Sequence, residues 1–369
     1  MSIRTLYFIG QCLSLDEHPT FRETIIAQFS EPEYDWNQFI WTCSNHLILP
    51  VIYLKFLKYD LLAYLPEVLA QHLKEIYTLN RTRNEQILLQ VKEINAILNL
   101  ANISPIYMKG TGNLIDGIYS DIGERIIGDI DLLVPEKDFL SAAKCIQNEG
   151  YVICIPTSLP SDQKRHHHYP RLWKKDVVAD IEIHRQPVIR KYETGFGADL
   201  ILQSKKAVAD YPGCYVPCDK HKVIHNFIHS QLTNSGHRLG VVSLRDIYDL
   251  YRFSLKTELT AVRSQTQSPK KAVAYFEIAH LLLGLPISEK KTMASKIFIW
   301  KHNLNLSSPI FNKTNRILWM ISWVVVHGFL KQIKELIIYK EERNLFIHNL
   351  GSKNWYILHW QFYKKMITG

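Results

Sequence analysis

The segment from Gly128 to Val134 carries two carboxylates, Asp129 and Asp131, at the start of an otherwise apolar stretch. Side chains alternate between the two faces of a β-strand, so both carboxylates point the same way. The apolar residues around them predict a strand buried on both faces and acidic only where it emerges from the sheet. Burying two repelling carboxylates is costly, whereas a divalent cation removes the conflict. The segment therefore predicts a core strand with a candidate metal site at one end.

The composition is that of a globular protein with a basic surplus. The chain has 369 residues, enough for about two or three domains. It is 47% hydrophobic and 21% charged, which excludes a disordered chain, and its six cysteines are too few for a disulfide framework. The net charge of +9 favours polyanionic partners such as nucleotides or nucleic acid. Much of the surplus lies in a basic tail, residues 301–369, with ten Lys or Arg against three Glu.

No stretch of the sequence predicts a membrane span. The first residues lack the apolar core and the cleavage site of a secretory signal. The longest apolar run, Ile317–Leu330, has fourteen residues, fewer than the roughly 20 needed to cross a bilayer. A buried helix is the expected structure there, with a membrane-surface role as a lesser alternative. We therefore expect a cytoplasmic protein.

The apolar pattern divides the chain into three regions. Residues 1–102 are predicted to be helical, because apolar side chains recur at helical spacing from Leu65 to Leu100, in one long helix or two stacked helices. Residues 103–190 predict a strand, a helix, a strand, a helix and then three strands. Residues 191–369 return to a helical pattern and end in the basic tail. The expected fold is α+β, a small mixed sheet flanked by N-terminal and C-terminal helical regions.

A glycine-rich turn precedes the acidic strand. Lys109–Gly112 follows the β-prone run Ile106–Met108, and a helix is predicted from Asn113 to Tyr119. Glycines let the backbone approach a phosphate, a helix N-terminus offers free N–H groups, and a threonine hydroxyl adds a further donor. Lys109 can reach a phosphate as a point charge. Such a turn followed by Asp-x-Asp on the next strand predicts a phosphate site beside the metal site.

A third carboxylate lies on a later predicted strand. The segment Asp180–His184 alternates polar and apolar residues, so Asp180, Glu182 and His184 share one face. If this strand lies beside the acidic strand, Glu182 joins the other two carboxylates. Three carboxylates at the mouth of a sheet suit two octahedral Mg²⁺ ions with open positions for phosphate oxygens.

The order of these motifs resembles the DNA-polymerase-β-like nucleotidyltransferase superfamily and, within it, the uncharacterised nucleotidyltransferase family. That family's pattern is a Lys-Gly turn, an Arg, Gly-Asp-Ile-Asp-Leu-Leu-Val, a His-rich strand, Glu-x-His and a later Leu-Arg-Asp. Here the matching residues are Lys109-Gly110, Arg125, Gly128–Val134, His166–Pro170, Glu182–His184 and Leu244–Asp246. The similarity covers roughly residues 1–260. The turn departs from the superfamily, because Gly-Thr replaces the usual Gly-Ser or Gly-Gly.

The resemblance implies an enzyme that moves a nucleoside monophosphate from a nucleoside triphosphate, ATP first, to an acceptor hydroxyl, with release of pyrophosphate. Asp129 and Asp131 would bind two Mg²⁺ ions, with Mn²⁺ as an alternative, and Glu182 would hold one of them and help activate the hydroxyl. The nucleotide would be held by Lys109, Gly110, Thr111, Arg125 and Gly128. A small molecule, an RNA end and a protein side chain all remain candidate acceptors.

Simpler interpretations of these motifs stay open. Asp-x-Asp at a strand end can be two solvated turn carboxylates, and Lys109 and Arg125 can be surface charges. Arg245 and Asp246 fit a structural ion pair between helices as well as a binding element. A non-catalytic binding or regulatory protein on the same scaffold is the alternative function, although the presence of all three carboxylates argues against it.

Two further clusters invite a metal interpretation. In His166–His168, neighbouring residues on a strand alternate faces, so only the first and third could converge, and we prefer His168 and His184 as polar lining of an acceptor cleft over a zinc site. Cys214 and Cys218 lie near Asp219 and His221, but their spacing is not a standard zinc pattern. The neighbouring proline and glycine residues indicate a simple turn there.

Overall fold

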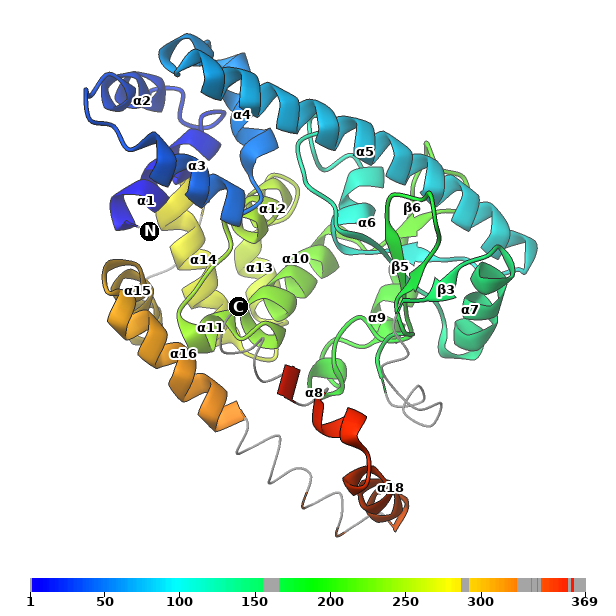
Figure 1. Cartoon of the computed structure of the whole chain (residues 1–369). Helices are drawn as coiled ribbons and strands as arrows, with labels where there is room; N and C mark the ends of the chain where they lie inside the picture. Colours follow the sequence, from blue (N-terminus) through cyan, green and yellow to red (C-terminus); the bar gives the residue numbers. More distant parts are fainter. Residues whose placement is uncertain are drawn as a thin grey trace. The chain divides into compact units, whose positions relative to one another are not determined.

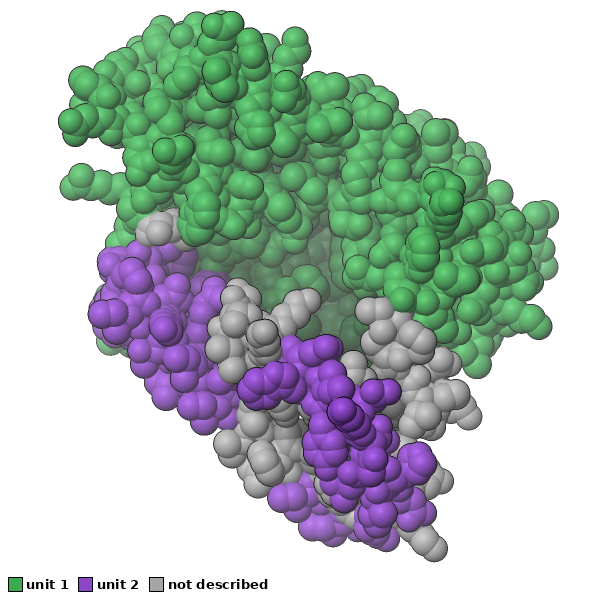
Figure 2. All heavy atoms as spheres, in the orientation of Figure 1, with its two compact units in different colours: residues 1–237, 242–299 green, residues 238–241, 300–369 purple. Residues whose placement is uncertain are grey.

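The computed structural model describes residues 2–154, 166–286, 292–323, 333, 337, 340–357 and 360–361 (Figure 1). The chain forms two compact units (Figure 2). The first comprises residues 1–237 and 242–299, and the second comprises residues 238–241 and 300–369. All residues predicted to form the site belong to the first unit.

The N-terminal part of the first unit is helical, as predicted. Its helices are α1 (Ile3–Leu13), α2 (Phe21–Phe29), α3 (Trp36–Asn45), α4 (Leu49–Lys58), the short 3-10 helix η1 (Leu62–Tyr64) and α5 (Glu67–Leu100). Phe8, Phe29, Phe39 and Phe56 pack edge to face or stacked in its core. Edge-to-face and offset contacts of this kind stabilise such clusters beyond the apolar area that they bury.

Helix α5 is one continuous helix of 34 residues, which settles the choice between one helix and two. Its polar central stretch stays helical because the neighbouring loop uses those polar groups. Asn80 Nδ2 donates to the Gly123 carbonyl at 2.7 Å, and Asn84 Nδ2 donates to the Ile122 carbonyl at 2.6 Å. These side-chain amides give buried backbone carbonyls a hydrogen-bond partner in place of water.

Seven short strands form one mixed sheet in the order β3-β4-β5-β2-β1-β7-β6. The strands are β1 (Ile106–Tyr107), β2 (Asp129–Leu133), β3 (Val152–Ile153), β4 (Leu172–Trp173), β5 (Asp180–His184), β6 (Lys206–Ala207) and β7 (Tyr215–Val216). β2 runs parallel to β5, and β1 runs parallel to β7 and antiparallel to β2. This confirms the predicted α+β fold. The strands β6 and β7 add an edge to the sheet that the sequence did not predict.

Helix α6 (Lys109–Ile115) packs against β1, β2 and β7, whereas α7 (Phe139–Asn148), preceded by the 3-10 helix η2 (Glu136–Asp138), packs against β5. The prediction of a turn before a helix at Asn113 was wrong, because α6 already begins at Lys109. Gly112 therefore lies inside the helix. A Cβ atom on Gly112 would lie 2.3 Å from the Tyr107 carbonyl oxygen, so glycine lets the helix press against the strand.

The rest of the described chain is mainly helical, as expected. In the first unit it includes α8 (Arg190–Glu193), α9 (Ala198–Gln203), α10 (Asp219–Phe227), the π-helical segment Ile228–Thr233, α12 (Leu244–Ser254), α13 (Leu259–Arg263) and α14 (Pro269–Leu283). Two helices, α11 (Gly236–Leu239) and α15 (Met293–Ser307), have residues in both units. The second unit also contains α16 (Pro309–Trp323) and α18 (Lys340–Leu350). Among the helices of the described ranges, none has both the length and the apolar character needed to cross a bilayer.

The basic tail is described only in part. The apolar run Ile317–Leu330 is helical in α16 as far as Trp323, and the remainder of the run lies outside the described residues. Four of its lysines, Lys331, Lys334, Lys364 and Lys365, also lie outside them.

Candidate active site

The parallel pairing of β2 with β5 sets the geometry of the acidic site. Asp131 lies opposite Glu182 in the register, and Asp129 lies opposite Asp180. Because side chains alternate along each strand, the carboxylates of the two strands emerge on one face. Asp131 is only 1% exposed, whereas Asp129, at the start of β2, is partly exposed. The three carboxylates expected from the sequence therefore lie side by side.

Asp131 has two nitrogen partners. Lys109 Nζ lies 2.5 Å from Asp131 Oδ1, and His184 Nε2 lies 2.8 Å from the same oxygen. Burial alone would raise the pKa of Asp131, but the charge of Lys109 and the hydrogen bond from His184 outweigh it and hold this pKa well below its usual range. Burial likewise opposes the charge of Lys109, yet Asp131 raises the pKa of Lys109. Asp131 is therefore a fixed negative charge in the interior.

The backbone of Lys109 is left-handed, with φ of +51°. A side chain with a Cβ atom pays about 1 kcal/mol or more for this conformation. Such strain is found where the surrounding structure requires a particular side-chain position. Here the turn from β1 into α6 directs the ammonium group of Lys109 toward Asp131.

Arg171, which was not predicted from the sequence, contacts the carboxylates of both Glu182 and Asp129. Its Nη2 atom lies 2.6 Å from Glu182 Oε1 and 3.2 Å from Asp129 Oδ2. Burial would raise the pKa of Glu182, but the hydrogen bonds from His184 and Arg171 lower it to about 2. Arg171 directly precedes β4, and the pairing of β4 with β5 brings it next to Glu182. The sequence offered one indication of this role, because Arg171 directly follows the His-rich segment His166–Pro170.

Asp129 behaves differently from the other two acids. Burial, Asp131 and Glu182 raise the pKa of Asp129 to about 6, and Lys109 and Arg171 only partly offset this. Three crowded carboxylates share too little positive charge, so the outermost one retains affinity for a proton. The same excess of negative charge favours a divalent cation.

Asp131, Glu182 and His184 form a possible metal site. Each offers one ligand atom, and these atoms all lie within 4.8 Å of one another. Within the described residues this group contains His184 and not Asp129, which is turned to Arg171. The sequence-based set of ligands was Asp129, Asp131 and Glu182, so the geometry adds an imidazole to the candidate ligands.

Of three predicted phosphate ligands, Gly110 and Thr111 lie in the first turn of α6, and Gly128 lies on the loop before β2. Gly110 and Gly128 line the cavity described below. Thr111 is buried, and its Oγ1 donates to the Asp129 carbonyl at 2.8 Å. That hydroxyl ties α6 to β2, so it is already engaged within the protein.

Arg125 is also engaged. It is 8% exposed, and its Nη2 and Nε atoms lie 2.9 and 3.0 Å from the carboxylate of Asp249. Burial opposes the charge of Arg125, but Asp249 raises its pKa further above the usual range. Tyr119 also donates to Asp249 Oδ1, at 2.8 Å. Arg125 therefore reaches the cavity wall with its charge balanced by a partner from α12.

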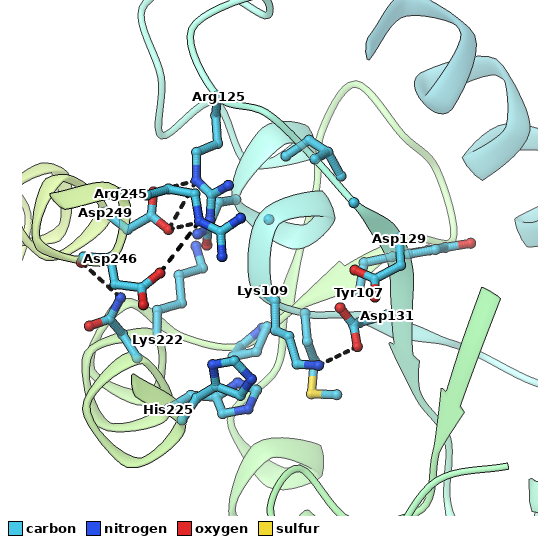
Figure 3. A pocket seen from close by; sticks show the side chains of 18 of the residues that line it. Tyr107, Lys109, Arg125, Asp129, Asp131, Lys222, His225, Arg245, Asp246 and Asp249 are labelled. Carbon is cyan, nitrogen blue, oxygen red and sulfur yellow. Dashed lines mark hydrogen bonds and ion pairs between the residues drawn. The ribbon is translucent and has the colours of Figure 1, made fainter. Parts of the chain in front are cut away.

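A cavity of about 280 Å³ opens between the acidic strand and the helices α10 and α12 (Figure 3). Its wall carries four carboxylates, Asp129, Asp131, Asp246 and Asp249, and four cationic side chains, Lys109, Arg125, Lys222 and Arg245. Buried Lys222 pairs with Asp116 and lies 3.3 Å from Asp219 Oδ1. Burial lowers the pKa of Lys222 in spite of these acids.

Arg245 and Asp246 both line this cavity. They are neighbours on α12, with Arg245 Nε 3.6 Å from Asp246 Oδ1, so the ion pair lies within one helix and not between helices. In the described structure the buried Nε atom of Arg245 has no hydrogen-bond partner. It is a donor available to a ligand.

A second cavity, of about 180 Å³, lies beyond Lys109. It contains both predicted acceptor-cleft residues, His168 and His184, together with His167, His225 and His229. The inference that only His166 and His168 of this segment could converge was wrong: His166 is exposed, and the rings of His167 and His168 lie 4.6 Å apart. The segment is not a regular strand there, because only His168 forms an isolated bridge with His184. Strand alternation therefore does not apply.

The cysteine cluster is the turn that was expected. The Cys214 amide donates to the Tyr211 carbonyl at 2.9 Å, and Gly213 has φ of +79°. His221 Nδ1 is hydrogen-bonded to the hydroxyl of Ser204 at 2.9 Å. The metal-competent group found among the described residues contains none of these side chains.

Five side chains of the site were not predicted. Arg171 contacts Glu182 and Asp129, and the other four line the cavities: Lys222, His225, His229 and Asp249. Four of them lie on helices or helical segments more than 30 residues beyond β5 in the chain. Only the tertiary fold brings them to the sheet. Asp249 had a weak signal, because it follows the Leu-Arg-Asp segment by one helical turn.

A family model described as "Uncharacterised nucleotidyltransferase" matches residues 32–283. The match includes every residue that lines the two cavities. No curated protein and no solved structure matches the chain.

Proposed function

The chain belongs to the uncharacterised nucleotidyltransferase family, and from this premise we propose that it is a metal-dependent enzyme that transfers a nucleoside monophosphate from a nucleoside triphosphate to an acceptor hydroxyl. One observation carries the proposal: β2 and β5 pair in a register that sets Asp131 opposite Glu182 beside a cavity with four cationic side chains. A site that combines carboxylates with cationic side chains suits metal ions and phosphates together.

The donor set fits a divalent metal ion. Carboxylate oxygens are the ligands that Mg²⁺ prefers, and the imidazole of His184 makes Mn²⁺ an acceptable alternative. Without an ion, the ammonium of Lys109 and the guanidinium of Arg171 are the charges that hold the three acids together. We propose Asp129, Asp131 and Glu182 as ligands of two Mg²⁺ ions, which would polarise the phosphate and lower the pKa of the acceptor hydroxyl.

The larger cavity would take the triphosphate, with ATP as the first donor to test. Arg245 has a buried Nε donor without a hydrogen-bond partner in the described structure, and Lys222 presents a buried ammonium to the same cavity. Lys109 would exchange Asp131 for a phosphate oxygen. Gly110 and Gly128 project no side chain into the cavity. A Cβ atom at Gly128 would have nothing within 4 Å, so the space beside it is open. Arg125 would shape the wall through Asp249.

The acceptor would enter the second cavity beside His168 and His184. Its hydroxyl oxygen forms a bond to the α-phosphorus, while the bond from that phosphorus to the bridging oxygen of the β-phosphate breaks. Pyrophosphate leaves, and the hydroxyl proton passes to solvent. Glu182 borders this cavity and Asp131 borders the other, so the reacting atoms would meet between the two strands.

The test is pyrophosphate release by the full chain with each nucleoside triphosphate, Mg²⁺ or Mn²⁺, and a panel of small-molecule, RNA and protein acceptors. We expect Asp131→Asn and Glu182→Gln to lower the rate by at least about 100-fold, as loss of a charge-stabilising group does. Glu149→Gln, an exposed acid after α7, is the matched control. Equal rates in all four proteins would refute the proposal. Nucleotide binding without any turnover would favour the non-catalytic alternative.

We also propose a cytoplasmic location. All six cysteines are free thiols in the structure. Free thiols persist in reducing compartments, and disulfides form in oxidising ones. Extraction of the native protein under thiol-trapping conditions would test this, and a disulfide found in the trapped protein would argue against it.

A further inference from the structure

The second cavity is a separate binding space that adjoins the larger one. Lys109, His225 and His229 line both cavities. The five histidines around the second cavity come from the segment before β4, the end of β5, the last turn of α10 and the π-helical segment. A ligand bound there would therefore lie against a nucleotide bound in the larger cavity.

Two buried nitrogen atoms at this cavity lack partners. His225 is 4% exposed and His184 is 1% exposed. In the described structure neither His225 Nε2 nor His184 Nδ1 has a hydrogen-bond partner. Buried polar atoms are nearly always hydrogen-bonded, and an orphaned one carries the full cost of its lost hydration. A ligand that hydrogen-bonds to both atoms would remove this cost.

The backbone around His229 is built for this arrangement. His225 and His229 are four residues apart, and the helix changes from α to π between them, at Ile228–Thr233. Single π-helical turns inside α-helices are rare and are frequent at functional sites. In Figure 3, His225 lies on the same side of the larger cavity as Lys222. The widened turn brings both imidazoles to the wall that the two cavities share.

The lining chemistry indicates hydroxyl groups. Five of the side chains that line this cavity are imidazoles: His167, His168, His184, His225 and His229. A neutral imidazole has one donor and one acceptor, which matches the two roles of a hydroxyl group. Val188 and Ile189 add an apolar wall that suits the C–H groups of a carbon ring.

The size and charge of the cavity disfavour larger acceptors. Its volume of about 180 Å³ is smaller than the about 280 Å³ of the larger cavity. Within the residues that line it, Lys109 is the single Lys or Arg, and Lys109 is bound to Asp131. An RNA end is held chiefly through its phosphates by basic side chains, which this wall does not offer.

We propose that this cavity binds a small neutral polyhydroxylated acceptor, a polyol or a monosaccharide, and that His225 Nε2 and His184 Nδ1 hydrogen-bond to its hydroxyl groups. The assignment rests on the proposed nucleotidyl transfer for its role as acceptor. Binding itself does not depend on that transfer, so the two can be tested apart.

The test is saturation-transfer NMR of the full chain with glycerol, myo-inositol, glucose, mannose and galactose, in the presence of Mg²⁺ and a non-hydrolysable nucleoside triphosphate. We expect at least one of these compounds to bind. His225→Leu should weaken its binding by at least about tenfold, whereas His225→Gln, whose amide can replace Nε2, should stay within about threefold. His72→Leu, on the exposed face of α5, is the matched control.

A second variant guards against misfolding of the first. Thr233 lines the second cavity and not the larger one, and Thr233→Phe should block polyol binding while the nucleotide analogue still binds. Polyol binding that survives both His225→Leu and Thr233→Phe, or binding of no compound in the panel, would overturn the assignment. Transfer to RNA or protein without polyol binding would overturn it and leave the proposed function intact. Polyol binding without transfer to any acceptor would uphold the cavity assignment and refute the proposed function.

Discussion

Lys109 Nζ lies 2.5 Å from Asp131 Oδ1, so a lysine at the start of α6 neutralises the most deeply buried carboxylate of the site. The strained backbone of Lys109 and the raised pKa of its ammonium both support this ion pair in the metal-free chain. The pair also separates the two cavities, because Lys109 lines both of them. It follows that Asp131 needs a cation beside it: Lys109 in the metal-free chain, or a metal ion once one is bound.

Replacing Lys109 should make folding depend on a metal ion. Without metal, Lys109→Met leaves Asp131 buried with one partner fewer, and we expect the free energy of unfolding to fall by about 3 kcal/mol. Millimolar Mg²⁺ should then raise the melting temperature more in Lys109→Met than in the wild type, because ligands that bind the native state stabilise it. Calorimetry with and without Mg²⁺ measures this. Lys137→Met, at an exposed lysine of η2, is the control, and equal Mg²⁺ shifts in all three proteins would contradict the prediction.

Stability should depend on pH through Asp129. Its pKa in the folded chain is about 6, above the value near 3.8 of an unperturbed Asp. A raised pKa gives stability that is complete below the unfolded value and is lost as pH rises through the folded value. We therefore expect the metal-free chain to lose roughly 2 kcal/mol from this group between pH 4 and pH 7. Urea unfolding of the wild type and Asp129→Asn at both pH values measures it, and identical pH dependence in the two proteins would rule the assignment out.

The buried pair of Arg125 and Asp249 should be coupled strongly. Asp249→Asn leaves Arg125 without its counter-charge, and we expect a loss of about 3 kcal/mol in the free energy of unfolding. Removing both charges in Arg125→Met/Asp249→Asn should recover part of that loss. A double-mutant cycle by chemical denaturation gives the coupling. The exposed pair of Arg81 and Glu85 is the reference, since Glu85→Gln should change stability by less than about 0.5 kcal/mol.

Arg83 should act as a positioning residue for both acidic strands. Its guanidinium donates to the Ile127 carbonyl before β2 and, at 2.9 Å, to the Val178 carbonyl before β5. We expect Arg83→Leu to lower kcat about tenfold or more with little change in KM, as loss of a support behind the reacting groups does. Arg83→Lys should recover part of the rate. Lys74→Leu, on the exposed face of the same helix, is the control. A change confined to KM would show that Arg83 acts in binding instead.

The acidic strands were predictable because the sequence pattern encodes them directly. The alternation in Gly128–Val134 and Asp180–His184 fixes which side chains share a face, and β2 and β5 both formed within those segments. The start of α6 was missed because Gly110 and Gly112 resemble a loop, whereas Gly112 serves close packing against Tyr107. Local propensity does not contain that tertiary contact.

The lysine, arginine and histidine side chains that complete the site could not be predicted from the sequence. Lys222, His225 and His229 lie on a helical stretch whose pattern predicts only an amphipathic helix. Their approach to Lys109 depends on how α10 packs against α6. The sequence predicts His167–Trp173 and Val177–His184 as a strand pair, and β4 does pair antiparallel with β5. It does not predict that this pairing brings Arg171 next to Glu182.

The length of α5 has a consequence for anyone who would move this active site into another protein. Three side chains of α5 donate hydrogen bonds to backbone carbonyls: Asn80 to Gly123, Arg83 to Ile127 and Gln90 to Ala179. The helix therefore binds both loops that lead into the acidic strands. The sheet with its acidic strands is therefore not an independent unit of the fold. A graft or a truncation must carry α5 with it, together with α4, which packs along it.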